Sequence, residues 1–143
     1  MTTIRRCSVD DFDAILPLLQ QLWPDKTIDS GASRRVFARG VDSSSQEYIC
    51  ATIDSKVVGF CSLVVKNNLW QEGYLGHIDE LVVEESVRGR GIGRALLDHI
   101  TQSARERGCK RIELDTAFHR KAAHQFYEDN GFHNRAYLFS KVL

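Results

Sequence analysis

Residues 87–94 read Val-Arg-Gly-Arg-Gly-Ile-Gly-Arg, and they stand between an apolar run, Leu81 to Val83, and an amphipathic segment. This order predicts a strand, a glycine-rich turn and the start of a helix. Glycines carry no Cβ, so such a turn can place several backbone N–H groups around one phosphate-sized ligand. The helix that follows adds the positive end of its dipole. We therefore expect this stretch to bind an anion.

The spacing of the glycines excludes two common phosphate binders. A Walker loop needs Gly-x-x-x-x-Gly-Lys followed by Ser or Thr, and this stretch has no such lysine. A dinucleotide-binding turn, Gly-x-Gly-x-x-Gly, needs its third glycine at position 94, where Arg94 stands. The remaining pattern is Arg-Gly-x-Gly-x-Gly, for which an ordinary tight turn between strand and helix is the alternative.

This remaining pattern resembles the pyrophosphate loop of the GNAT superfamily of acetyl-CoA-dependent N-acetyltransferases. Residues 122–132, Ala-Ala-His-Gln-Phe-Tyr-Glu-Asp-Asn-Gly-Phe, are similar to the second motif of the same superfamily, with its alanine-bearing helix, Phe-Tyr and terminal Gly-Phe. The two motifs stand in the expected order. The resemblance implies an N-acetyltransferase that moves an acetyl group from acetyl-CoA to a primary amine by direct attack.

Composition is typical of a globular protein. The chain has 143 residues, of which 43% are hydrophobic and 27% charged, so we expect one domain over 1–143. Nineteen basic and nineteen acidic residues cancel, so no overall field favours nucleic acid or membrane. No apolar stretch approaches the ~20 residues of a membrane helix, and no signal-peptide segment is present, so we expect a cytoplasmic protein. A homodimer stays open.

Strands and helices alternate along the chain. The predicted order is β-α-α-β-β-β-α-β-α-β, a mixed α/β fold, and the resemblance implies that two central parallel strands splay apart to bind acyl-CoA. Predicted strands span about Thr3 to Cys7, Tyr48 to Ile53, Val57 to Val65, Leu75 to Val83, Arg111 to Asp115 and Tyr137 to Val142. Predicted helices run from Ser8 and Asp11 to near Trp23, from Ser30 to Arg39, from Ile92 to Gly108, and from Lys121 to Asn130.

The resemblance also implies the residues that bind the cofactor. The backbone of Leu81, Val82 and Val83 would contact the acyl and pantetheine part in the splay. The pyrophosphate would lie on Arg88, Gly89, Arg90, Gly91, Ile92, Gly93 and Arg94, although each arginine is equally explained as part of a solvated basic turn. His119 stands where many members carry Asn, eight residues before Tyr127. It would hydrogen-bond pantetheine or cap the following helix.

Tyr127 matches the tyrosine that, in this family, donates a proton to the departing CoA thiolate. A phenol with a pKa near ~10 stays protonated at pH 7 and can donate to a thiolate whose thiol titrates near ~8.5. The alternative is a structural role, in which Tyr127 anchors the helix beside Phe126.

An alkyl amine is almost entirely protonated at pH 7, so the reaction also needs a base. Strict alternation would place His77, Asp79, Leu81 and Val83 on one face of their strand and Ile78, Glu80 and Val82 on the other. Asp79 stands nine residues before Arg88, where several polyamine and arylalkylamine acetyltransferases carry a Glu or His with this role. Asp79 is therefore the first candidate, followed by Glu80 and His77.

Each candidate base has an alternative role. Glu80 would form a salt bridge to a neighbouring helix, and His77 would be a packed, hydrogen-bonded histidine. No metal is predicted, because His119 and His124 have no third ligand at metal-site spacing. The four cysteines are widely spaced, as expected for reduced buried thiols. A covalent route through Cys109 or Cys61 lacks a nearby His and Asp arrangement.

The sequence does not identify the acceptor, and either a small-molecule amine or a peptide amine is compatible with it. We expect the choice to lie in Leu22 to Gly40 and Lys66 to Gly73. There Trp23, Trp70 and Tyr74 could form an aromatic wall, and Asp25, Asp29 and Glu72 could attract a cation. A different class of function is a sensor or interaction module that binds acyl-CoA on the same fold without turnover.

Overall fold

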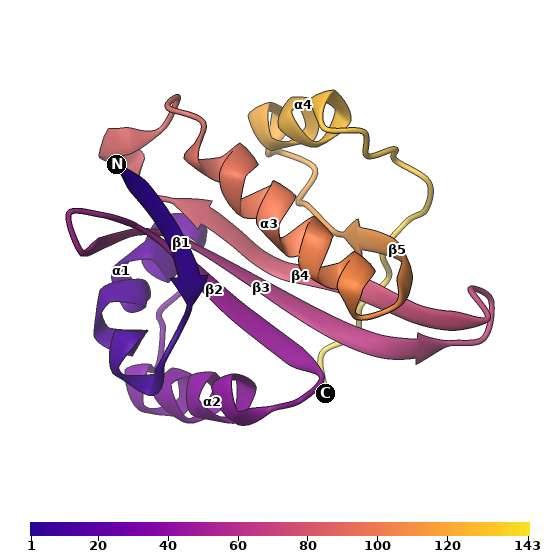
Figure 1. Ribbon diagram of the computed structural model, residues 1–143, viewed down its shortest axis with the longest axis horizontal. Helices are drawn as coiled ribbons and strands as arrows, with labels where there is room; N and C mark the ends of the chain where they lie inside the picture. Colours follow the sequence, from indigo (N-terminus) through magenta and orange to yellow (C-terminus); the bar gives the residue numbers. More distant parts are fainter.

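The computed structural model describes residues 1–143 and is built on a five-stranded sheet in the order β1-β2-β3-β4-β5 (Figure 1). Neighbouring strands run antiparallel, except that β4 and β5 run parallel. The strands are β1 (Thr2–Arg6), β2 (Gln46–Ile53), β3 (Lys56–Asn68), β4 (Gly73–Val83) and β5 (Cys109–Leu114). The helices are α1 (Phe12–Leu22), α2 (Ser30–Asp42), α3 (Ile92–Glu106) and α4 (Lys121–Asp129), with short 3-10 turns at η1 (Val9–Asp11) and η2 (Glu85–Val87).

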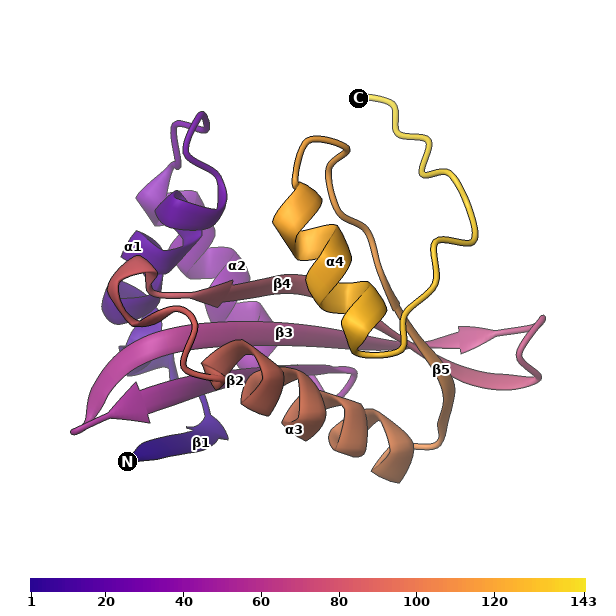
Figure 2. The ribbon, with the colours of Figure 1, turned by 90° about the horizontal axis from the view of Figure 1, so that it is seen from above.

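Helices cover both faces of the sheet. One core cluster joins α1 and α2 to the sheet through Phe12, Ile15 and Phe37, and the other joins α3 through Leu96 and Ile100. In Figure 2 these two groups of helices lie on opposite sides of the sheet. The mixed α/β architecture is as predicted. None of the helices combines the length and apolar character needed to cross a bilayer.

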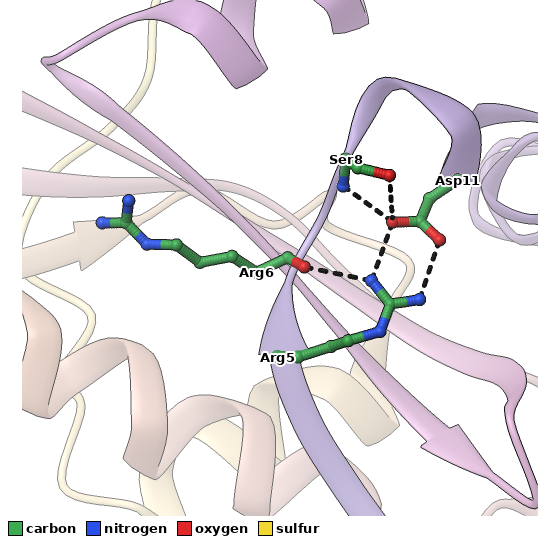
Figure 3. Close-up of polar contacts among 4 residues, drawn as sticks. All are labelled: Arg5, Arg6, Ser8 and Asp11. Carbon is green, nitrogen blue, oxygen red and sulfur yellow. Dashed lines mark hydrogen bonds and ion pairs between the residues drawn. The ribbon is translucent and has the colours of Figure 1, made fainter.

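The junction between β1 and α1 is fixed by a small polar cluster (Figure 3). The backbone N–H of Ser8 donates to Asp11 Oδ2 at 2.7 Å, which satisfies an N–H group at the helix start. Arg5 Nη1 and Nη2 donate to the two carboxylate oxygens of Asp11, each at 2.8 Å. These hydrogen bonds hold the pKa of Asp11 below its usual value. The predicted helix start at Ser8 and Asp11 is confirmed, with η1 preceding the α-helix.

Helix α2 runs to Asp42, three residues beyond its predicted end, because Gly40 does not terminate it. A Cβ at Gly40 would overlap the Tyr48 ring and its hydroxyl oxygen. The glycine therefore lets the Tyr48 ring pack directly on the helix. Glycine is therefore needed at position 40 for packing, not to end the helix.

The strands differ from the predicted ones mainly in length. The predicted loop from Lys66 begins too early, because β3 continues to Asn68, and β4 starts at Gly73. Backbone pairing with the opposite strand holds these polar residues in the sheet. Asp54 and Ser55, both with positive φ, form the turn of the hairpin between β2 and β3.

The predicted last strand, Tyr137 to Val142, is wrong for this structure. Residues 133–143 belong to no strand or helix and make no backbone hydrogen bond. Their side chains are exposed, including Tyr137 at 82% and Phe139 at 91%. A strand needs a partner for its backbone groups, and this segment leaves the sheet rather than pairing with it (Figure 2).

Candidate active site

Strands β4 and β5, at one side of the sheet, separate part-way along β4. Their ladder runs from Tyr74 opposite Cys109 to Ile78 opposite Leu114, where β5 ends. Strand β4 continues to Val83, paired only with β3. The edge of β4 that would face β5 is therefore unpaired from Asp79 onward. The predicted splay is present, and it offers backbone groups to an amide-bearing ligand.

A cavity of about 610 Å³ opens at this separation. It lies between the α1–α2 connection, the ends of β4 and β5, and α4. Its walls are formed by Leu22, Trp23, Pro24, Asp25, Lys26, Ile78, Asp79, Leu81, Leu114, Asp115, Thr116, Ala117, His119, Arg120 and Tyr127. The hydroxyl oxygen of Thr116 is buried without any hydrogen-bond partner in the protein. An unsatisfied buried hydroxyl is costly, so this atom indicates a place where a ligand binds.

Tyr127 reaches this cavity from α4. Its ring packs edge-on against Phe126 and Phe132, with centroids 5.4 and 5.7 Å away. Burial raises the pKa of the phenol above its usual value, so the hydroxyl keeps its proton at neutral pH. Both roles considered for Tyr127 are compatible with this geometry, because its ring is packed and the residue is part of the cavity wall.

His77 lies between two carboxylates. Its Nδ1 is 2.9 Å from Asp79 Oδ1, and its Nε2 is 3.1 Å from Asp115 Oδ1. The hydrogen bond to Asp79 raises the pKa of His77, and the charge of Asp115 adds to this. Each ring nitrogen therefore faces a carboxylate oxygen. The three residues therefore form a cluster with net negative charge whose carboxylates border the cavity.

Asp115 was not among the residues singled out from the sequence. It follows β5 directly, and the parallel register Ile78 opposite Leu114 places it beside the end of the paired part of β4. The sequence signal that could have identified Asp115 is its position, as an acidic residue immediately after the last apolar residue of a parallel strand. In open α/β sheets, that edge is where ligands bind.

The predicted alternation of side chains between the two faces of β4 is interrupted at Asp79. Ile78 pairs with Leu63 and Glu80 with Ser62, so Asp79 is an extra, bulged residue. The bulge reverses the alternation, because Ile78 and Leu81 pack in the α3 cluster while Val82 packs in the α1–α2 cluster. It also frees Asp79 from the ladder and turns it toward the cavity.

Glu80 is held by a neighbouring strand, not by the predicted salt bridge to a helix. Ser62 Oγ donates to Glu80 Oε1 at 2.8 Å and accepts from the Glu80 backbone N–H at 3.0 Å. Burial raises the pKa of the Glu80 carboxyl, although the bond from Ser62 works in the opposite direction. Glu80 does not line the cavity.

Replacing Glu80 by glutamine should stabilise the fold at neutral pH. The pKa of Glu80 is higher in the folded state than in the unfolded state. Ionisation of Glu80 therefore lowers the free energy of unfolding as the pH rises from the unfolded-state pKa through the folded-state pKa. Glutamine keeps an acceptor for Ser62 and carries no charge. Thermal unfolding should show a Tm higher by roughly a few degrees at pH 7 and nearly unchanged at about pH 3. A Tm that falls equally at both pH values would contradict this account.

The glycine turn is confirmed as the start of α3. Gly89 and Gly91 have φ values of +80° and +82°, which L residues rarely adopt, and a Cβ on either would point into open space. The first intrahelical bond runs from the Ala95 N–H to the Gly91 carbonyl at 3.0 Å. The preceding N–H groups, those of Ile92, Gly93 and Arg94, are therefore free for an anion.

The arginines of this turn differ in what they contact. Arg88 Nε donates to the Val83 carbonyl at 2.9 Å and so ties the turn to the end of β4. Arg94 Nε lies 3.8 Å from Asp98 one helical turn later, and both side chains are exposed. Arg90 is exposed. The backbone of the turn thus provides the fixed part of an anion site, and the side chains of Arg90 and Arg94 extend into solvent around it.

Other predicted acceptor residues divide into two groups. Trp23 and Asp25 line the cavity, as does His119. Trp70 lies at the far hairpin instead, with the guanidinium groups of Arg111 and Arg135 over its ring at 5.6 and 5.8 Å. Trp70, Glu72 and Tyr74 are absent from the cavity wall, because the β3–β4 hairpin carries them to the opposite end of the sheet.

The cysteines are free thiols. Cys61, one of the two considered as a nucleophile, is completely buried, and burial raises the pKa of its thiol. Neither Cys61 nor Cys109 borders the cavity. A covalent route through them is thus not favoured by the geometry.

The chain belongs to the acetyltransferase (GNAT) family, whose model matches residues 12–132. It is an N-acetyltransferase of that family, as its relatives indicate. An aminoalkylphosphonate N-acetyltransferase from Salmonella typhimurium is 32% identical over 140 residues, covering 98% of this chain and 90% of the relative. A glucosamine 6-phosphate N-acetyltransferase from Arabidopsis thaliana is 24% identical over 146 residues, covering 98% and 95%.

Solved structures agree on the fold. A candidate acetyltransferase from Agrobacterium tumefaciens superposes with a TM-score of 0.88 at 28% identity, covering 99% of each chain. The crystal structure of glucosamine-6-phosphate N-acetyltransferase from Arabidopsis thaliana gives a TM-score of 0.83 at 22% identity, covering 99% of this chain and 98% of that one. The second likeness concerns the fold alone.

Proposed function

We propose that this enzyme takes its acetyl group from acetyl-CoA and transfers it directly to the primary amine of a small molecule. One observation carries the proposal: the unpaired edge of β4 begins at a cavity lined by the carboxylate cluster and ends at Val83, to which the glycine turn with its free N–H groups is tied by Arg88. The donor and the acceptor thus each have a complementary group within one site.

The residues present fit acetyl-CoA. The free N–H groups at the start of α3 suit its pyrophosphate, and the open space beside Gly89 and Gly91 leaves room for it. The unpaired backbone from Asp79 to Val83 suits the amides of pantetheine. Thr116 supplies an unsatisfied hydroxyl at the same cavity. His119, on the cavity wall, is proposed as a further pantetheine contact.

Acetyl-CoA supplies an activated thioester, and the protein has to manage two protons. Asp79 accepts a proton from the acceptor ammonium, directly or through water, while His77 holds the carboxylates of Asp79 and Asp115 in place. Tyr127 donates its phenolic proton to the departing sulfur. Asp79 is favoured over His77 as the base because both ring nitrogens of the imidazole face carboxylates.

The acceptor is proposed to be a small amine that also carries an anionic group. The cavity wall includes Lys26 and Arg120 in addition to its carboxylates, so opposite charges on one ligand can both be matched. The names of two relatives support this class, since one acts on aminoalkylphosphonates and another on glucosamine 6-phosphate.

A screen of CoA release with acetyl-CoA and a panel of amines tests the proposal. The panel pairs aminoalkylphosphonates and glucosamine 6-phosphate with uncharged analogues of matched length, and adds polyamines, an aminoglycoside and a lysine peptide. We expect the highest kcat/KM for amines bearing phosphonate or phosphate. Binding of CoA without its release from acetyl-CoA by any amine would instead support the sensor class.

Replacing Asp79 by asparagine should reduce kcat/KM most near neutral pH, with partial recovery at higher pH as free amine becomes abundant. Asparagine keeps the size of the side chain and a hydrogen bond to His77, but it cannot accept the proton. The measurement is a kcat/KM profile from about pH 6 to 10 for both proteins with one active amine. Parallel profiles that differ by less than about threefold would transfer the base role to Glu80, His77 or solvent.

A further inference from the structure

One wall of the cavity is formed by residues 22–26, the end of α1 and the start of its connection to α2, and we call it the acceptor wall. Gln20 Nε2 donates to the backbone carbonyls of Trp23 and Lys26, each at 3.0 Å. The Lys26 N–H also donates to the Trp23 carbonyl, at 3.2 Å. These bonds close the chain into a turn, so the acceptor wall is fixed to the end of α1.

Gln21, the next residue, joins this end of α1 to the connection between β4 and α3. Its side-chain carbonyl accepts from the Glu85 backbone N–H at 3.0 Å, and its Nε2 donates to Glu84 Oε1 at 3.3 Å. No other hydrogen bond links α1 to residues 84–94. Both halves of the Gln21 amide thus form a bridge between two elements that are far apart in the sequence.

The β4–α3 side of the bridge is held by bonds of its own. The Glu84 N–H donates to the Val58 carbonyl of β3 at 2.7 Å, and the Glu84 carboxylate accepts from the Ser86 N–H at 2.6 Å. Arg88 ties the same connection to the end of β4. In Figure 2 the connection runs beside α1 and then leads into the glycine turn. Loss of the bridge should therefore release the acceptor wall and leave the anion site in place.

We propose that Gln21 positions the acceptor amine, by holding the acceptor wall at a set distance from the turn that binds the donor. This role rests on the proposed function, in which donor and acceptor meet in the cavity. The amine has to come within about 3–3.5 Å of the thioester carbon, and a misplacement of ~1 Å can cost ~100-fold in rate. Gln21 does not line the cavity itself, so it acts through residues 22–26 as a positioning residue.

Gln21→Glu breaks the bridge with the smallest change of shape. The variant keeps an acceptor for the Glu85 N–H, but it places a carboxylate against that of Glu84, where like charges repel. We expect kcat/KM for an aminoalkylphosphonate to fall about tenfold, mainly through a higher KM for the amine, with KM for acetyl-CoA changed less than about twofold. A wild-type KM for the amine, or an equal rise in both KM values, would overturn the proposal.

A double variant that exchanges the donor and the acceptor of the bridge tests whether this one contact is responsible. Combining Gln21→Glu with Glu84→Gln places an amide opposite the new carboxylate, and the amide oxygen still accepts from Ser86. Glu84→Gln alone completes the cycle. We expect the double variant to recover kcat/KM to within about threefold of wild type, so that the two single losses are strongly non-additive. Losses that multiply in the double variant would overturn the proposal.

Quenching of Trp23 fluorescence by acrylamide follows the acceptor wall without catalysis. The chain has two tryptophans, and Trp70→Phe removes the other one, at the far hairpin. In this background, without ligand, we expect Gln21→Glu to make Trp23 more accessible to the quencher and added Glu84→Gln to reverse the change. Unchanged quenching would overturn the proposal. Altered and restored quenching in a protein that acetylates no amine would support the bridge and contradict the proposed function.

Gln102→Glu is the matched control. Gln102 Nε2 donates to Glu106 Oε1 at 3.2 Å on the exposed side of α3, outside the cavity, so the substitution makes the same chemical change opposite the same group. We expect wild-type KM values and wild-type quenching of Trp23. A rise in the KM for the amine equal to that of Gln21→Glu would show a general effect of the added charge and would overturn the positioning role.

Discussion

Tyr127→Phe should lower kcat on the order of 100-fold while leaving acetyl-CoA affinity nearly unchanged. The substitution removes only the phenolic hydroxyl, which donates no hydrogen bond within the protein, whereas the ring keeps its edge-on contacts with Phe126 and Phe132. The loss should therefore fall on the chemical step rather than on folding. Single-turnover rates and thermal unfolding of the variant measure these two effects separately.

Tyr137→Phe is the matched control, because it makes the same chemical change at an exposed tyrosine outside the cavity. It should keep the wild-type kcat. Equal kcat for the Tyr127 variant and wild type, with chemistry shown to be rate-limiting, would assign Tyr127 to packing alone.

Gly91→Val should abolish stabilisation of the protein by CoA. Wild type should gain a few kcal/mol when CoA is well above its Kd, because the ligand binds only the folded state. In the variant, the new side chain would project into the open space above the turn, where the phosphate is proposed to lie. Its positive φ would also be strained, by roughly 1–2 kcal/mol. Thermal shift with and without CoA separates these effects.

Gly108→Val provides the control for strain. Gly108 has φ +84° at the other end of α3, so valine there meets a comparable backbone penalty far from the turn. We expect a lower Tm for both variants without ligand, but a wild-type shift on adding CoA only for Gly108→Val. A CoA-induced shift that survives Gly91→Val would remove the turn from the proposed site.

The sequence predicted the parts of the site that local chemistry dictates. Glycines with positive φ at 89 and 91 and the Ser8–Asp11 helix start have causes within a few residues, and both were recognisable. The separation of β4 and β5 was also predicted, although that prediction came from the family resemblance and not from the residues themselves. The family assignment rested on two short motifs, and it holds over residues 12–132.

What the sequence could not give depends on contacts between distant elements. Asp115 joins the site only through the register of β5 on β4, and Gly40 is explained only by the Tyr48 ring from another element. The bulge at Asp79 arises from pairing with β3, so periodicity within β4 alone could not reveal it. Likewise, a strand-like pattern at Tyr137 to Val142 says nothing about where a partner lies.

The single extra residue in β4 makes the site sensitive to chain length as well as to residue identity. Strict alternation of side chains, followed backwards from the glycine turn, assigns residues of β4 to the correct face of the sheet only as far as Glu80. On the other side of the bulge it assigns every residue to the wrong face. Deleting one residue there would keep every apolar side chain yet exchange the faces of the preceding part of β4. A design that transfers the Asp79 carboxylate to another scaffold would also need the bulge, because a regular strand of the same composition would direct the side chain to a different face.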